Sequence, residues 1–318
     1  MQQKQQNNDP FGLFSTLLLA YKLKKNIFLI SIIASLLFLL AFLIIDDQYT
    51  SSSVLKLRNQ ESSPAISSSP FGDLSAIARG DSFSMSSKQD IGFLYGLLNS
   101  RSFYSEKILS NKTILPMIIA FSNYDKANQI NVYDNDLYNS EEEKWLGQYE
   151  QLNDQDYFNS LGVNSFYVFY DLLNYNFDKD TGLFTISVTH PSPIVAKDLL
   201  DTVVNSINIF MQEKQILEAD KALNFLFKEL EKNPPEQVQI GISSLIYKNL
   251  NKKMLASIDE ESYFFEIVDQ SFLPTAKSGP DRLFFTLIFF ILIVLSQLIL
   301  LAIYLAFKSD YAQFNSDR

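Results

Sequence analysis

The sequence predicts an α/β domain with a long extended helix, flanked by two transmembrane helices. Two uncharged apolar stretches at 26–45 and 283–307 predict the transmembrane helices. A bilayer core about 30 Å thick needs about 20 apolar residues in a helix, because only intrahelical hydrogen bonds satisfy the backbone inside lipid. Strand patterns next to both stretches, and a helical pattern of about 40 residues between them, predict the α/β domain.

The charges beside the first apolar stretch set the orientation of the chain. Lys22, Lys24 and Lys25 precede it, and Asp46 and Asp47 follow it. Positive charge stays on the cytoplasmic side, so both termini are expected in the cytoplasm and the main domain outside it, which is compatible with a bacterial periplasm. A cleaved signal peptide is the rival interpretation, but no small-x-small site follows the stretch and its apolar core is too long.

The expected organisation therefore has five parts. A cytoplasmic N-terminal tail covers 1–25 and the first transmembrane helix 26–45. The periplasmic α/β domain covers 46–282, the second transmembrane helix 283–307 and a cytoplasmic C-terminal tail 308–318. The two tails are too short to bury a core, so we expect no kinase or ATPase domain in them.

Composition excludes several classes of partner and chemistry. Residues 46–282 hold 33 of the 36 acidic and 20 of the 26 basic side chains, and the resulting negative surface repels nucleic acid phosphates. The chain has no cysteine, which excludes disulfides, thiolate metal ligands and thiol nucleophiles. No Gly-rich phosphate loop with a following Lys is present.

Three segments have strand patterns. Tyr49–Leu57 follows the first apolar stretch, and Tyr263–Val268 precedes the second. In Phe184–Thr189 apolar Phe, Ile and Val alternate with polar residues, which is the period of a half-buried strand. We expect the strands beside the two apolar stretches to pair, since both start at the membrane surface. The Ser/Pro-rich stretch 61–70 is expected to be a loop.

Four segments have helical patterns: Ser87–Asn99, Ser140–Gln151, about 192–232, and Pro235–Ser257. In the third, Ser192 is placed to cap the helix and Pro193 to begin it. Its apolar stripe comprises Ala196, Leu199, Val203, Ile207 and Phe210, and its polar stripe comprises Asp198, Asp201, Asn205, Asn208 and Gln212.

The third helix would be about 60 Å long, longer than a compact domain needs. Its apolar side chains would then need cover from neighbouring subunits, which predicts a homo-oligomer. Leu223→Asp or Phe227→Asp is expected to disrupt that assembly.

Candidate chemistry in the sequence is sparse. His190, the only histidine, lies in a turn without a partnered nucleophile. The run Asn176–Gly182 resembles a calcium loop, but positions six and twelve hold Thr181 and Ser187, so a tight turn is the better explanation. We therefore assign no catalytic, cofactor-binding or metal-binding residue. The Asp/Asn/Tyr-rich stretch 123–180 offers polar and aromatic contacts to sugars, or is ordinary surface.

Two segments and the order of elements resemble a known family. The segments are Thr181–Ala196, which leads into the long helix, and Phe272–Pro280, which leads into the second apolar stretch. They resemble the polysaccharide co-polymerases, the chain-length determinant proteins of bacterial inner membranes. Pro274 and Pro280 keep the outer positions of the family's P-x-x-P-x-x-P, while Lys277 replaces the middle proline. The second apolar stretch also lacks the glycines common in the family.

The resemblance implies a non-enzymatic regulator of O-antigen or related glycan chain length, of the type without a kinase. It implies a homo-oligomer beside an integral-membrane polysaccharide polymerase, with a lipid-linked glycan as a further possible partner, no cofactor, and a role in lipopolysaccharide biosynthesis. The alternatives are a two-pass extracytoplasmic sensor and a polysaccharide transport accessory protein. A sensor would need a cytoplasmic output element, which 308–318 does not provide.

Overall fold

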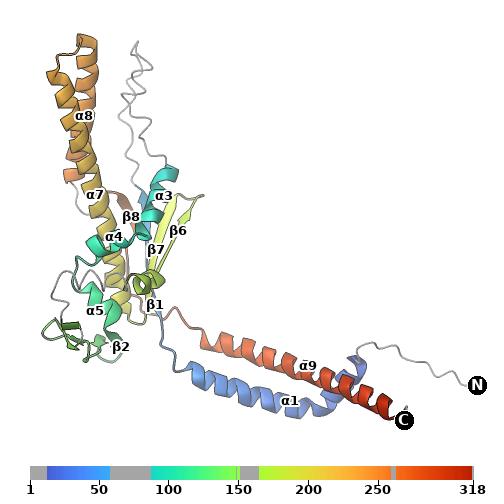
Figure 1. The fold of residues 1–318 in the computed structure, drawn as a ribbon. Coiled ribbons are helices and arrows are strands. Elements are labelled where there is room, and N and C mark those ends of the chain that lie inside the picture. The colour runs from blue at the N-terminus through green and yellow to red at the C-terminus, as the bar shows by residue number, and fades with distance from the viewer. Residues whose placement is uncertain (1–12, 58–86, 148, 151–164, 259–262, 317–318) are drawn as a thin grey trace, which may run out of the picture. The chain divides into compact units, whose positions relative to one another are not determined.

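The computed structural model describes residues 13–57, 87–147, 149–150, 165–258 and 263–316 (Figure 1). The chain forms two compact units: one comprises Met1–Asp47 with Ser278–Arg318, and the other comprises Gln48–Lys277. The Ser/Pro-rich stretch 61–70 lies outside the described residues.

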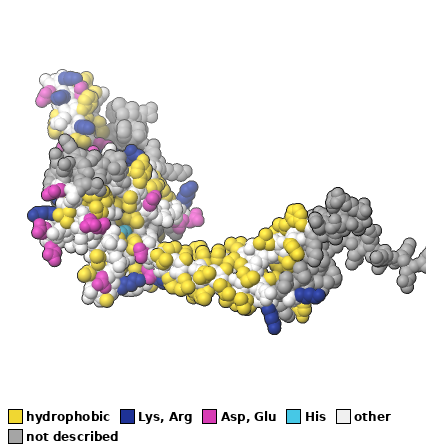
Figure 2. Space-filling model, turned by 60° about the horizontal axis from the view of Figure 1, so that its bottom comes forward, with side chains coloured by type: hydrophobic (Ala, Val, Ile, Leu, Met, Phe, Trp, Pro, Cys, Tyr) yellow, Lys and Arg dark blue, Asp and Glu magenta, His cyan; other side chains and the backbone are white. Residues whose placement is uncertain are grey.

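The first unit is a pair of helices, α1 Leu13–Phe42 and α9 Arg282–Ser316. Their apolar windows, Lys25–Phe42 and Arg282–Tyr304, are 6% and 0% buried, so neither is the core helix of a globular domain. Hydrophobic side chains cover the visible surface of these helices in Figure 2. Two such helices near the termini are compatible with a two-pass membrane protein. The first helix ends at Phe42, three residues before the expected end at Ile45.

Aromatic contacts and one ion pair hold α1 and α9 together. Phe38 stacks on Phe289 with ring centroids 4.1 Å apart. Beyond the end of α1, the Nη2 atom of Arg282 donates to the Ile45 carbonyl at 2.7 Å and lies 3.0 Å from Asp47 Oδ1. The pair is mostly covered, so its charges are screened less than those of an exposed pair. Arg282 therefore binds the chain where it leaves the first helix.

The second unit is built on a four-stranded antiparallel sheet with the order β6-β7-β1-β8. The strands are β1 Tyr49–Leu57, β6 Leu173–Asp178, β7 Leu183–His190 and β8 Phe265–Asp269. β1 pairs with β7 along its length, from Tyr49 opposite His190 to Lys56 opposite Leu183. Its other edge pairs with β8, so the strands beside the two apolar stretches are neighbours as expected.

Helices cover one face of this sheet (Figure 1). The long helix α7 Pro193–Glu231 packs on β1 and β7 and continues beyond them, and α8 Glu236–Ile258 returns along it. Smaller helical elements are α3 Ser87–Leu98, α4 Arg101–Phe103, a π-helix Tyr104–Ile108, α5 Ile114–Ile119 and a helix at 165–172. The core joins fully buried side chains of sheet and helix: Leu55, Phe184, Ile186, Leu199, Val203 and Ile207.

Local chemistry fixes both ends of α7 as the sequence predicts. Ser192 Oγ accepts from the Val195 N–H at 3.3 Å, and Pro193 occupies the first turn. At the other end, Asn233 adopts a left-handed φ of 50° before the two prolines, and α8 begins at Glu236. Asparagine tolerates this conformation better than most residues, so the chain reverses there.

The predicted helix Ser140–Gln151 is wrong. The chain instead forms a hairpin of β4 Tyr138–Asn139 and β5 Lys144–Trp145. Asn139 Oδ1 accepts from the N–H groups of Glu141 and Glu142, which offers the backbone a turn in place of a helix. Across the hairpin, Trp145 packs on Tyr138 with ring centroids 5.1 Å apart. A second hairpin, β2 Phe121–Asp125 and β3 Ile130–Tyr133, extends into the Asp/Asn/Tyr-rich stretch 123–180, where the sequence predicted no strand.

Candidate functional site

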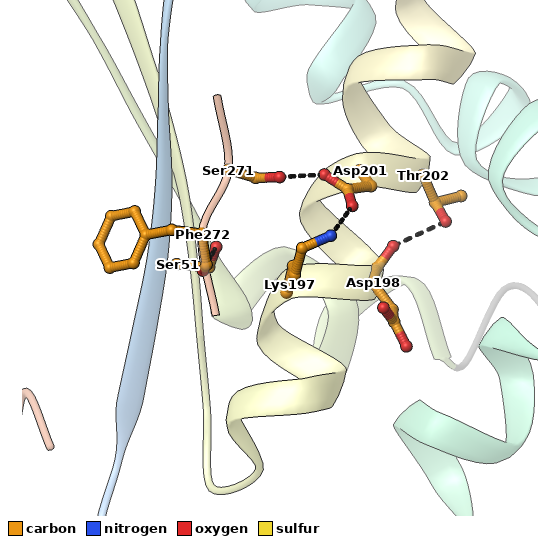
Figure 3. A network of polar contacts seen from close by, with 7 residues as sticks. All are labelled: Ser51, Lys197, Asp198, Asp201, Thr202, Ser271 and Phe272. Atoms are coloured by element: carbon orange, nitrogen blue, oxygen red, sulfur yellow. Dashed lines mark hydrogen bonds and ion pairs between the residues drawn. The ribbon is translucent and has the colours of Figure 1, made fainter. Parts of the chain in front are cut away.

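Three segments meet at a polar junction formed by the beginning of β1, the chain after β8 and the first turns of α7 (Figure 3). The backbone pairing of β1 with β8 covers only Val54–Leu57 and shifts register at Val54. Beyond that point buried serines replace the ladder: Ser53 Oγ donates to the Asp269 carbonyl and Ser51 Oγ to the Phe272 carbonyl, both at 2.8 Å. The two chain segments that adjoin the apolar helices are thus bonded side to side.

The α7 side of the junction is charged. Lys197 Nζ donates to Asp201 Oδ2 at 2.6 Å, and Ser271 Oγ donates to Asp201 Oδ1 (Figure 3). The hydrogen bond to Asp201 raises the pKa of Lys197, whereas burial raises the pKa of Asp198. A lysine base needs a lowered pKa, so Lys197 is poorly suited to proton transfer. The arrangement therefore holds the segment after β8 on α7.

His190 is the last residue of β7 and is buried. Its Nδ1 accepts from the Ser192 N–H at 3.0 Å, and the ring of Phe121 packs edge-on against it at 4.5 Å. Burial lowers the pKa of His190 to about 4, so the imidazole is neutral at pH 7. The sequence places His190 in a turn, whereas the structure makes it the last residue of the strand, opposite Tyr49. Its ring accepts from the backbone as the chain turns into α7.

The buried histidine predicts a pH dependence of stability. The folded pKa lies below the ordinary value of 6.5, so protonation favours the unfolded chain. Stability is fully present above about pH 6.5 and falls by about 3 kcal/mol as the pH drops to about 4. His190→Asn keeps an acceptor for the Ser192 N–H, and it should remove this pH-dependent part of the free energy of unfolding because asparagine does not titrate. The measurement is urea unfolding between pH 7 and 4.5, followed by the single tryptophan, Trp145. Parallel losses in both proteins would contradict the prediction.

The run Asn176–Gly182 comprises the end of β6 and the turn that leads into β7. Asp178 Oδ1 accepts from the Asp180 N–H at 2.9 Å and Oδ2 from Thr181 Oγ1 at 2.8 Å, while Gly182 takes a φ of 70° that favours glycine. The hydroxyl of Thr181 and the backbone lower the pKa of Asp178. The turn explanation is confirmed. Among the described residues no group of three or more His, Asp or Glu side chains could hold a metal ion.

Two side chains of the predicted polar stripe of α7 are in fact buried. Asn208 Oδ1 accepts from the N–H groups of Phe264 at 3.2 Å and Phe265 at 3.1 Å. Gln212 Nε2 donates to the Ala256 carbonyl at 2.5 Å. These amides bind the backbone that enters β8 and leaves α8. The helical period alone gives no signal for them, because the segments they satisfy are about 45–55 residues away in the sequence.

The α7–α8 pair exposes an apolar surface. Large hydrophobic side chains are exposed along both helices: Leu217, Phe225, Phe227, Val238, Ile240, Leu250, Met254, Leu255 and Ile258. Phe227 is 45% exposed, as an assembly contact requires, whereas Leu223 is buried within its own subunit. Leu223→Asp is therefore no clean test of assembly, since it would disturb the folded subunit itself.

Comparisons with known proteins add a structural likeness. No known family model matches the chain, and no curated protein matches it either. A solved structure titled as a full-length bacterial polysaccharide co-polymerase is similar to the chain, with 12% identity and a TM-score of 0.29. The match covers 94% of this chain and 98% of that one. A likeness with this TM-score and identity does not assign a function to the chain.

Proposed function

We propose that the protein is a non-enzymatic regulator of surface polysaccharide chain length. In this proposal it is an oligomeric scaffold in a bacterial inner membrane, beside the polymerase that makes the glycan. Residues 26–45 and 283–307 span the membrane, 46–282 lie in the periplasm, and both termini are cytoplasmic. The resemblance of Thr181–Ala196 and Phe272–Pro280 to the chain-length determinant proteins supports a surface polysaccharide as the polymer whose length is regulated.

The observation that carries the proposal is the polar junction. Ser51 and Ser53 bond the segment that follows the first apolar helix to the segment that precedes the second, and Ser271 bonds that segment to α7. The segments that lead to the two apolar helices are thus bonded to each other and to α7. This arrangement is expected of a domain that must be held firmly by its two membrane anchors. Such a protein would act as a scaffold that positions its partners. It would make or break no covalent bond itself.

The exposed apolar surface of α7 and α8 supports the oligomeric part of the proposal. Several large apolar side chains exposed on one pair of helices are typical of a protein contact. A second copy of the chain carries the same surface, so neighbouring subunits can cover it. The assembled domains would then surround or border the polymerase, which would meet the scaffold through the membrane helices.

Deleting the gene tests the proposal directly. We expect surface polysaccharide, separated on a gel, to lose its modal band cluster and to show chains of unregulated length. Expression of the full chain from a plasmid should restore the modal cluster. An unchanged ladder in the deletion strain would reject the proposal. Loss of all surface polysaccharide would instead favour a transport accessory protein.

A further inference from the structure

Four elements of the second unit bring a group of aromatic and polar side chains to the surface. We define the tyrosine–arginine patch as Asn99 after α3, Arg101 of α4, Tyr167 and Tyr170 of the helix 165–172, and Tyr175 of β6. Tyr167 is 55% exposed and Tyr170 is 37% exposed. Asn99 and Arg101 are exposed as well, so the patch is open to an extended ligand.

Contacts join the residues of the patch in two groups, Arg101 with Tyr167, and Asn99 with Tyr175 and Tyr170. Arg101 donates to the Tyr167 hydroxyl, and its guanidinium carbon lies 5.0 Å from the Tyr167 ring centroid. Asn99 Nδ2 donates to the Tyr175 hydroxyl at 2.6 Å. Burial and a hydrogen bond with Tyr170 raise the pKa of Tyr175 to about 12, so its phenol is neutral and both donates and accepts.

The exposed tyrosines stand on a fixed base. On the inner side of the helix 165–172, Phe166 and Phe169 are buried and pack against the ring of Tyr104 with centroids 5.7 Å and 4.7 Å away. The Tyr104 hydroxyl donates to Ser165 Oγ at 2.9 Å. The core contacts of the helix therefore come from other residues, and Tyr167 and Tyr170 are held outward without being needed for the core.

The chemistry of the patch matches a sugar ring. A pyranose has an apolar C–H face that packs on an aromatic ring, and hydroxyls at its edge that need donors and acceptors. The patch offers ring faces from Tyr167 and Tyr170 together with phenol, amide and guanidinium groups beside them. A lipid tail would leave those polar groups unpaired, at a cost in free energy. Its one charged group, Arg101, also suits a neutral or acidic sugar better than a basic one.

We propose that the tyrosine–arginine patch binds sugar units of a polysaccharide, with Tyr167 and Tyr170 stacking on the rings and Arg101 and Asn99 donating to hydroxyl or carboxylate oxygens. The inference rests on the proposed function, because it is that function that places a glycan beside the domain. An open patch of this kind binds one unit weakly. Neighbouring subunits would strengthen the interaction by presenting several patches to one chain.

The test measures binding of purified surface polysaccharide from the source cells to the full-length protein in nanodiscs, by biolayer interferometry. Tyr167→Ala with Tyr170→Ala is expected to weaken binding by at least about tenfold, which corresponds to the loss of two aromatic contacts. Tyr247→Ala is the matched control, because Tyr247 is an exposed tyrosine (69%) on α8, outside the patch. The affinity of this variant for the polysaccharide should equal that of wild type. Arg101→Gln, a single change at an exposed position, should weaken binding severalfold. It replaces the double variant as the test if the double variant unfolds at a lower urea concentration than wild type.

The outcomes separate this inference from the proposed function. Equal affinity of wild type and patch variants, or no binding by wild type, would overturn the inference even where gene deletion removes the modal ladder. Weakened binding in the patch variants supports it even where deletion leaves the ladder unchanged. Loss of oligomers in the double variant with unchanged polysaccharide binding would make the patch a subunit contact and overturn the inference too.

Discussion

Replacing Asn208 by alanine is expected to lower the free energy of unfolding by about 2–4 kcal/mol, because it removes the acceptor of two buried backbone N–H groups. Those groups belong to Phe264 and Phe265, which lead into the edge strand β8. Asn208 lies on α7 with its side chain buried, so water has little access to the two N–H groups that the lost oxygen leaves unpaired. We therefore expect β8 to be the element that this substitution destabilises most.

Asn205→Ala is the matched control. It changes the same residue type one turn earlier on the same helix, at an exposed position. Alanine has the higher helix propensity, so this variant should be neutral or more stable by about 0.5 kcal/mol. Urea unfolding of the full-length protein in detergent, followed by Trp145 fluorescence, checks both. Trp145 is the only tryptophan and is buried in the second unit, so the signal does not come from α1 or α9. Similar midpoints for both variants would refute the role of Asn208.

The elements that the sequence predicted well are those with a strong local period or a strong local stop. β1 is found at Tyr49–Leu57 as predicted, and α7 runs from Pro193 to Glu231 against an expectation of about 192–232. Alternation along Phe184–Thr189 of β7, the Ser192 cap and the Asn233 turn are properties of neighbouring residues. Local sequence therefore carries them without knowledge of the tertiary structure.

The errors lie where side chains act on distant or competing backbone. Around Asn139, a side-chain acceptor and a left-handed Glu143 favour a hairpin over the helix that the capping pattern suggested. Asn208 and Gln212 read as solvent-facing because the helical period places them opposite the apolar stripe. Their partners become visible only when α8 and β8 are placed in space.

The parts of the candidate site were predicted unevenly for the same reason. The sequence indicated that the chain segments beside the apolar stretches would lie together, and pairing of β1 with β8 bears this out. The hydrogen bonds of Ser51 and Ser53, beyond the backbone pairing of β1 with β8, could not be predicted, because serines in a strand normally lie on its solvent-facing side. The sequence also could not tell Leu223 from Phe227, because both fall on one apolar helix pattern until α8 covers one of them.

Phe227→Asp is expected to abolish the oligomer while leaving the subunit folded. Phe227 and its neighbour Phe225 are exposed on α7, so an aspartate there costs the isolated subunit little. In an assembled contact the same carboxylate would be buried without a partner, at a cost of several kcal/mol in each interface. Since that cost repeats at every interface of a symmetric assembly, loss of the oligomer rather than gradual weakening is the expected result.

Asn224→Asp provides the control for this last prediction, because it adds a negative charge of the same kind at an exposed position three residues before Phe227. Crosslinking in membranes and native mass measurement in detergent should show intact oligomers for Asn224→Asp and monomers for Phe227→Asp. Unchanged Trp145 unfolding midpoints in both would show that the subunit is folded. Under the proposed function, only the Phe227→Asp strain should then lose the modal polysaccharide cluster. Intact oligomers in Phe227→Asp and in Phe225→Asp would mean that the exposed face of α7 does not hold the assembly together.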